Sequence, residues 1–232
     1  MLKRTLFFLL TISLISACGK SGGHHEEYPY GHYEDDKMIG TVSEINRGES
    51  GIVVDISEWE KRDRRGPGMT EEGYSYQAKI TDETVMKYEA GEEASIDDIK
   101  KGQKVLVNPP REDNFKGHPD EIILLEMSYK EKYSRLLSHT DGFNIVILYK
   151  DGETLPVEMQ ETVYENVMKI LEGTKHGASA AWVPNDENYI VNYKEELDIE
   201  QFPAMLVFDK KELVFKSYSV EELYEFFKKL SE

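Results

Sequence analysis

The sequence LDIEQFPAMLVFD, residues 197–209, places a proline directly before a run of apolar residues that ends at an aspartate. Residues 205–208 contain no polar position, which predicts a strand. Pro203 has no backbone N–H, so it fits the start of such a strand. Residues 213–218 form a second apolar and aromatic run, and the polar turn between the two runs predicts an antiparallel hairpin.

The residues before this hairpin alternate between strand and helix patterns. Residues 143–149 and 178–183 are apolar runs that predict two further buried strands. Residues 155–171 and 186–197 carry apolar side chains at helical spacing, and a last amphipathic helix follows the hairpin. The predicted order for residues 141–232 is therefore β-α-β-α-β-β-α.

This order resembles the thioredoxin fold. The segment VPNDEN, residues 183–188, is similar to the V-D-x-D-x-N passage of that family, and PAMLVFD, residues 203–209, is similar to its P-T-x-x-x-F strand. The resemblance implies a cis peptide bond between Phe202 and Pro203, and a face that accepts an extended peptide of a partner protein. The residues expected on that face are Gln201, Phe202, Pro203, Asp151, Gly152 and Glu153.

The chain departs from this family at the position of its chemistry. Redox members carry C-x-x-C between the first strand and the first helix, where the helix N-terminus lowers the pKa of a thiol. Residues 150–156 of this chain read KDGETLP, and Cys18 is the only cysteine in the sequence. Because thiol–disulfide exchange requires a thiolate, the sequence favours a binding role for this domain, with no catalytic residue and no cofactor assigned.

Residues 37–128 predict a small β domain. Short strand patterns occur at 38–45, 51–57, 74–81, 105–107 and 121–127, with a helical turn expected at 95–101. Five short strands with a helical turn before the fourth are typical of an OB-like small β-barrel. The segment IDDIKKGQKVLV, residues 96–107, also resembles small barrel domains in lipoproteins of Gram-positive bacteria. The predicted fold class is therefore α/β plus β, with a helix over residues 129–140 that joins the two domains.

The first residues have the pattern of a secretion signal. Lys3 and Arg4 precede an apolar run that is too short to span a bilayer, and residues 14–18 read LISAC. This sequence resembles the lipobox of bacterial lipoproteins. The alternative for the apolar run is a buried N-terminal helix. The resemblance implies cleavage after residue 17 and a diacylglycerol group on Cys18, with palmitate as a typical acyl chain. The mature protein would then be anchored to the cell membrane on its extracytoplasmic face.

Residues 18–36 have no strand or helix period, and their composition is typical of a flexible acidic tether. The whole chain has a formal charge of −17, which becomes −19 if Lys3 and Arg4 are removed with the signal peptide. Nucleic acids are bound through clustered Lys and Arg, so this charge argues against a nucleic-acid partner. The expected partners are the lipid bilayer, through the acyl chains on Cys18, and a protein of the cell envelope.

Four further hypotheses remain open from the sequence. The tether could handle a metal ion, since imidazole and carboxylate suit Cu²⁺, Ni²⁺ or Zn²⁺. Its candidate ligands are His24, His25 and His32. The basic residues at 61–65 could dock an anion, and Tyr74, Tyr76 and Tyr88 could stack on a ligand, although core positions are the alternative for these tyrosines. An enzyme would need a deep pocket with converging groups of shifted pKa.

Overall fold

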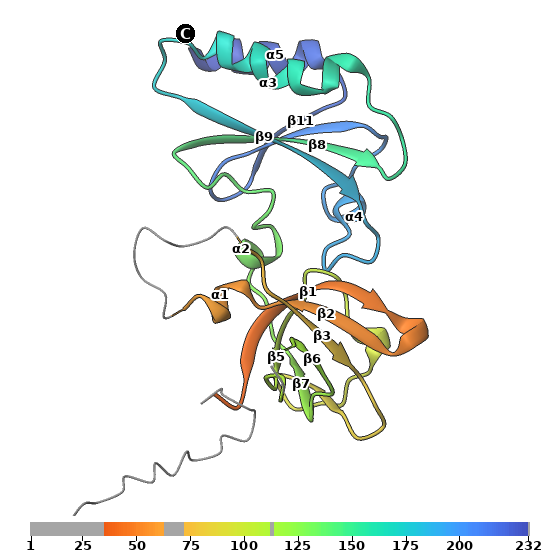
Figure 1. Ribbon diagram of the computed structural model, residues 1–232. Helices are drawn as coiled ribbons and strands as arrows, with labels where there is room; N and C mark the ends of the chain where they lie inside the picture. The colour runs from red at the N-terminus through yellow and green to blue at the C-terminus, as the bar shows by residue number, and fades with distance from the viewer. Residues whose placement is uncertain (1–34, 63–71, 112–113, 232) are drawn as a thin grey trace, which may run out of the picture.

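The computed structural model describes residues 35–62, 72–111 and 114–231. It is a mixed α/β structure with few helices and two separate sheets, one of seven strands and one of four (Figure 1). The predicted combination of β and α/β structure is confirmed at this level. Among the described residues, no helix has the length and apolar character needed to cross a bilayer.

The larger sheet has the open strand order β4-β7-β5-β1-β2-β3-β6. β1 lies at its centre and pairs antiparallel with β2 and β5, while β4 with β7 and β3 with β6 are parallel pairs. The strands are β1 Met38–Asn46, β2 Gly51–Asp55, β3 Ser75–Lys79, β4 Val85–Tyr88, β5 Lys104–Val107, β6 Lys116–Gly117 and β7 Glu121–Leu124. The five predicted strands are present, and β4 and β6 are additional.

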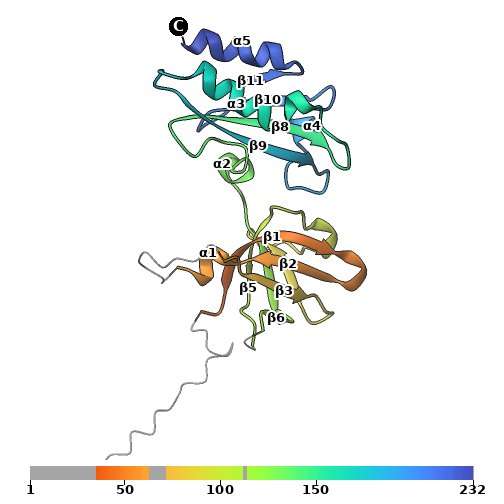
Figure 2. The same ribbon diagram turned by 45° about the horizontal axis from the view of Figure 1, so that its top comes forward.

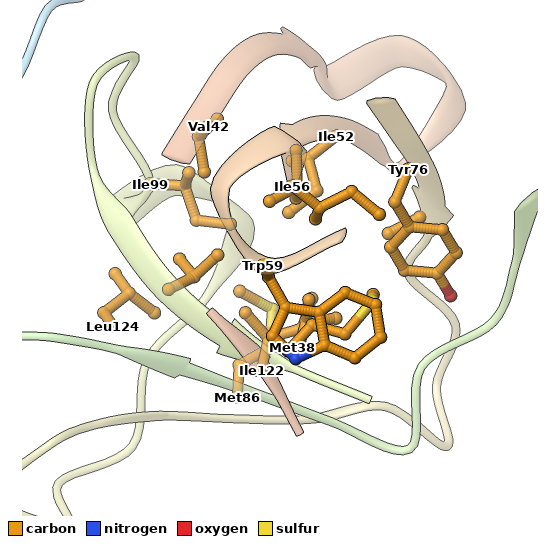
Figure 3. Close-up of a cluster of buried hydrophobic side chains, with 14 residues drawn as sticks. Met38, Val42, Ile52, Ile56, Trp59, Tyr76, Met86, Ile99, Ile122 and Leu124 are labelled. Atoms are coloured by element: carbon orange, nitrogen blue, oxygen red, sulfur yellow. The ribbon is translucent and has the colours of Figure 1, made fainter. Parts of the chain in front are cut away.

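The core of the larger sheet follows from the alternation of side chains along its strands. Met38 and Val42 of β1 are buried, together with Ile52 of β2 and Ile122 of β7. The short helix α1 (Ser57–Glu60) places the Trp59 ring against this cluster (Figure 3). The described ranges also contain the 3-10 turns η1 Arg47–Glu49, η2 Ile96–Asp98 and η3 Val157–Met159. η2 lies within the helical turn expected at 95–101.

The smaller sheet has the strand order β11-β10-β8-β9. β8 and β9 are parallel, and β10 pairs antiparallel with both β8 and β11. Its elements are β8 Gly142–Lys150, α3 Glu161–Ile170, β9 Gly177–Asn185, α4 Tyr193–Glu196, β10 Ala204–Phe208, β11 Leu213–Ser217 and α5 Val220–Ser231. Every residue of β10 is buried. The expectation of a buried strand at 178–183 is wrong, because β9 is an edge strand in which only Val183 is buried. The predicted order β-α-β-α-β-β-α is confirmed.

Two layers cover the smaller sheet. Helices α3 and α5 lie beside each other on one face (Figures 1 and 2) and enclose a core that includes Ile145 and Val207. The other face packs against residues 133–137 and α4, where Leu136 and Tyr193 are fully buried. Asn144 of β8 fixes this second layer, because its side-chain amide donates a 2.9 Å hydrogen bond to the carbonyl of Leu136.

Three predicted helices are shorter than expected. The helix expected over 155–171 is divided into η3 and α3, and α3 begins only at Glu161. The capping box at Ser128 and Glu131 is present, but α2 spans only Tyr129–Lys132 and does not continue to residue 140. The chain turns there because Leu136 and Leu137 pack under the smaller sheet. The helix expected over 186–197 is reduced to α4, since the residues before it pair with the larger sheet.

That pairing is a single backbone bridge between the two sheets. The N–H of Lys101 donates to the carbonyl of Asn188 (2.9 Å), and the carbonyl of Lys101 accepts from the N–H of Ile190 (2.7 Å). The Lys101 ammonium also lies 2.9 Å from the Asp186 carboxylate. The segment that follows β9 is therefore used for contact with the larger sheet, which overrides its helical spacing.

Candidate functional site

Three chain segments leave the smaller sheet at the same end. Leu148 of β8 lies opposite Ala204 of β10, and Lys150 lies opposite Asn185 of β9. The loop after β8 and the segment before β10 therefore emerge together, at the end where the arrowheads of β8 and β9 point (Figure 1). This register brings the predicted residues 151–153 and 201–203 to one end of the sheet.

The segment before β10 is held in place by β11. The Lys216 ammonium donates to the carbonyls of Leu197 (3.1 Å) and Asp198 (2.5 Å). The N–H of Glu200 donates to the Tyr218 hydroxyl at 3.0 Å. These bonds fix both sides of the turn that leads to residue 201, so the approach to the candidate site is a positioned loop.

Residues 201–203 combine an exposed side chain with an anchored one. Gln201 is exposed, whereas Phe202 is half-buried and packs against the core beneath the sheet. The peptide bond between Phe202 and Pro203 is cis, as the family resemblance implied. The arrangement leaves the Gln201 side chain available to a partner and uses the Phe202 ring to secure the loop.

The loop after β8 is acidic and exposed. Asp151, Gly152 and Glu153 are all exposed, and Gly152 has a φ of +79°, which favours glycine. The N–H of Glu153 donates to the carbonyl of Lys150 (3.1 Å), and their side chains form an exposed ion pair at 3.5 Å. This loop can offer carboxylates and backbone groups to a partner, and it contains no thiol.

The 3-10 turn η3 adds an apolar residue that the sequence did not single out. Val157 is 72% exposed, and it lies four residues after Glu153 of the acidic loop. Two residues later Met159 is buried, and its carbonyl accepts a 2.8 Å hydrogen bond from the indole N–H of Trp182. A single exposed valine is ordinary on a protein surface, so Val157 is of interest only because its turn is anchored close to the loop after β8.

A concave region lies on the larger sheet. It is an open groove of about 1410 Å³ beside β2, β3 and the chain before β7. Arg111 and Asp120 form an ion pair there at 2.8 Å. Both carboxylates and cations line the groove, so its charge selects no single class of ligand.

The proposed stack of tyrosines is wrong as a shared ligand face. Tyr76 is only 1% exposed and belongs to the core, where burial, with a further contribution from negative Asp120, raises the pKa of its hydroxyl. Tyr74 packs against the same core, and Tyr88 lies on the edge strand β4. The alternative is confirmed for two of these tyrosines: Tyr76 is a core residue of β3, and Tyr74, just before β3, is half-buried against the same core.

The remaining sequence candidates lie partly or wholly outside the described residues. Cys18, His24, His25 and His32 are outside them, so the lipid and metal predictions stay predictions. Within the described ranges there is no group of three potential metal ligands. Of the basic residues at 61–65, Arg62 packs on the Trp59 ring at 4.1 Å and forms an ion pair with Asp35 at 2.6 Å.

Comparison with known proteins gives no match, either to a family model or to a curated protein sequence.

Proposed function

We propose that the chain is a membrane-anchored extracytoplasmic lipoprotein that acts as a non-catalytic binding module. Its smaller sheet belongs to a thioredoxin-like domain without a thiol, and residues 151–153, 157 and 201–203 bind an exposed segment of an envelope protein. The larger sheet belongs to an OB-like domain between this site and the lipid. The observation that carries the proposal is the exposed, anchored sheet end, in which side chains for contact are present and the sulfur for redox chemistry is missing.

The topology of the smaller sheet supports the thioredoxin-like assignment. A parallel β8–β9 pair joined through α3, followed by an antiparallel β10–β11 hairpin and a final helix, is the arrangement that the family resemblance implies. The helices α3 and α5 share one face of the sheet. Since fold alone does not determine activity, the binding role rests on the sheet end and on the missing cysteine.

The larger sheet has a feature that supports the OB-like assignment. β6 and β7 lie near opposite ends of the strand order, yet only residues 118–120 separate them along the chain. Residues 116–124 therefore pair with β3 at one end and with β5 and β4 at the other. One chain segment that contacts both sides of a curled sheet is the connection that a small barrel requires.

The lipobox-like sequence at 14–18 supports the anchor. Lipid on Cys18 would also occupy the only thiol of the chain. Stable anchoring requires about two acyl chains, which a diacylglycerol group provides. Replacing Cys18 by Ser should move the protein from the membrane fraction to the soluble fraction of the cell. Unchanged membrane association of this variant would contradict the anchor.

Binding at the sheet end is tested by capture of an envelope partner from detergent-solubilised cells. Val157→Asp should reduce the captured partner at least about tenfold, because it introduces a charge into the apolar part of the contact. Val214→Asp on β11 is the matched control, since Val214 is also exposed, at 38%. Equal capture by the wild type and both variants would place the binding site elsewhere.

A further inference from the structure

The two sheets end in four edge strands, and one of them differs from the others. β4, β6 and β11 contain four, two and five residues, and each carries a lysine. β9 has nine residues, GASAAWVPN, and none of them is charged. Edge strands are normally kept short, charged or covered, because their free backbone groups pair with other chains. β9 lacks these protections over most of its length.

The outer side of β9 has unpaired backbone groups. Its ladder runs to β8 alone, and within the described ranges no further backbone partner of residues 177–185 is present. Strand residues direct N–H and C=O groups to alternate sides, and a proline in an edge strand places its nitrogen on the open side. Pro184 therefore indicates that Ala178, Ala180 and Trp182 present their N–H and C=O groups outward.

The charges that flank β9 indicate what would pair with it. Lys175 lies two residues before the strand and Glu187 lies two residues after it, and both are exposed. Neither forms an ion pair within the described part of the chain. If two copies of β9 pair antiparallel over their whole length, residue 181 faces itself, and the first residue of one strand faces the last residue of the other. At each end of the pair, Lys175 just before one strand then lies near Glu187 in the turn just after the other strand.

We propose that β9 pairs antiparallel with β9 of a second copy of this chain, about a twofold axis at Ala181, to give one continuous eight-stranded sheet. Ala180 and Trp182 of opposite copies exchange backbone hydrogen bonds, and the Lys175–Glu187 pairs set the register. A neutral strand is the segment of this acidic chain that can meet its own copy with least charge repulsion.

The proposed dimer is weak in solution. A single strand pair buries less surface than the roughly 1,200–2,000 Å² of stable protein interfaces. The proposal does not rest on the partner site described above, because β9 lies on one side of β8 and residues 201–203 lead into β10 on the other side. A dimer with the β9 edges paired leaves that sheet end open.

Single-cysteine cross-linking tests both the contact and its register. The full chain is prepared in detergent with Cys18→Ser, so that no native thiol remains, and with Ala181→Cys or Ser179→Cys. At the axis the two Cα atoms are about 4.5 Å apart, as in a non-hydrogen-bonded antiparallel pair, which suits a disulfide. Two copies of residue 179 would be about 14 Å apart. Ala181→Cys should form a covalent dimer under mild oxidation, at least about ten times faster than Ser179→Cys.

Charge reversal tests the choice of a second copy as the occupant. In the Ala181→Cys background, Lys175→Glu or Glu187→Lys alone should lower the dimer yield about fivefold, because two ion pairs become repulsive. The double reversal should restore the yield. Absence of a dimer with Ala181→Cys, equal rates at positions 181 and 179, or no rescue by the double reversal would each overturn the proposal. Unchanged circular dichroism of the variants shows that folding is not the cause.

Discussion

Gly102 lies where the two sheets touch, directly against the ring of Tyr189. Its φ is +81°, and a Cβ atom on it would lie 2.5 Å from Cε2 of that ring. Neighbouring Lys101 supplies the backbone bridge to the smaller sheet. The Arg135 guanidinium also stacks on this tyrosine, at 3.9 Å from the ring centroid. At the residue scale, the contact between the sheets depends on a position that has room only for hydrogen.

Gly102→Ala should therefore lower the free energy of unfolding by about 2–4 kcal/mol, through both the positive φ and the clash with Tyr189. Gly91→Ala is the matched control, since Gly91 has a φ of +101° but nothing within 4 Å of its added Cβ. It should cost only the backbone part, about 1–2 kcal/mol. Urea denaturation measures both variants, and equal losses would contradict the packing described for Tyr189.

The lowered pKa of Glu131 predicts how acid changes the stability of the contact between α2 and β5. The Lys104 ammonium, 2.7 Å away, and the hydroxyl and N–H of Ser128 lower the pKa of this carboxyl from 4.5 to about 2. Because the folded pKa is the lower one, the stabilisation is present above pH 4.5 and is lost as the pH falls towards about 2. Solvent screening limits it to about 1 kcal/mol.

Lys104→Met should raise the pKa of Glu131 and reduce the loss of stability between pH 4.5 and about 2. The measurement is the free energy of unfolding in urea at several pH values, together with an NMR titration of the Glu131 side chain. A titration of Glu131 that is the same in the variant and the wild type would show that the ion pair is not formed.

At the scale of the elements, strands were more predictable than helices. Residues 143–149 form a long apolar run and are a central strand of their sheet. The run at 178–183 also identified a strand but not its burial, because β9 lies at the edge. The helix expected over 186–197 failed because the backbone around Lys101 competes for the same residues, a contact between distant segments that no local pattern reveals. β6 was missed because two residues carry no periodicity. β4, with the sequence VMKY, was missed because it lacks the three consecutive apolar residues that mark β5 and β7.

The turn η3 shows how an element supports the candidate site. Trp182 of β9 donates its indole N–H to the carbonyl of Met159, and this bond ties the turn to the sheet. Trp182→Phe should lower the free energy of unfolding by about 1 kcal/mol and speed amide exchange in residues 155–160. Trp59→Phe, in the core of the larger sheet, should leave exchange in that turn unchanged. Equal exchange of the turn in both variants would contradict this anchoring role.

At the scale of the whole molecule, the sequence predicted the components better than their contacts. The two classes of sheet and the residues of the candidate site follow from patterns and from the family resemblance. The bridge at Lys101 and the exposed Val157 do not, because a single backbone contact and a lone valine in a polar stretch leave no periodic signal. The segments at 151–153 and 201–203 meet at one end only because the register of β8 with β10 places them there.

The central claim is that this sheet end binds a partner protein. A photo-crosslinking amino acid in place of Gln201 tests it in living cells, with the same replacement at Lys210 as control. Lys210 is also exposed, but it follows β10 at the opposite end of the sheet. The account predicts a covalent adduct with one envelope protein from position 201, found in the membrane fraction, and none from position 210. No adduct at position 201, or the same adduct from both positions, would contradict it.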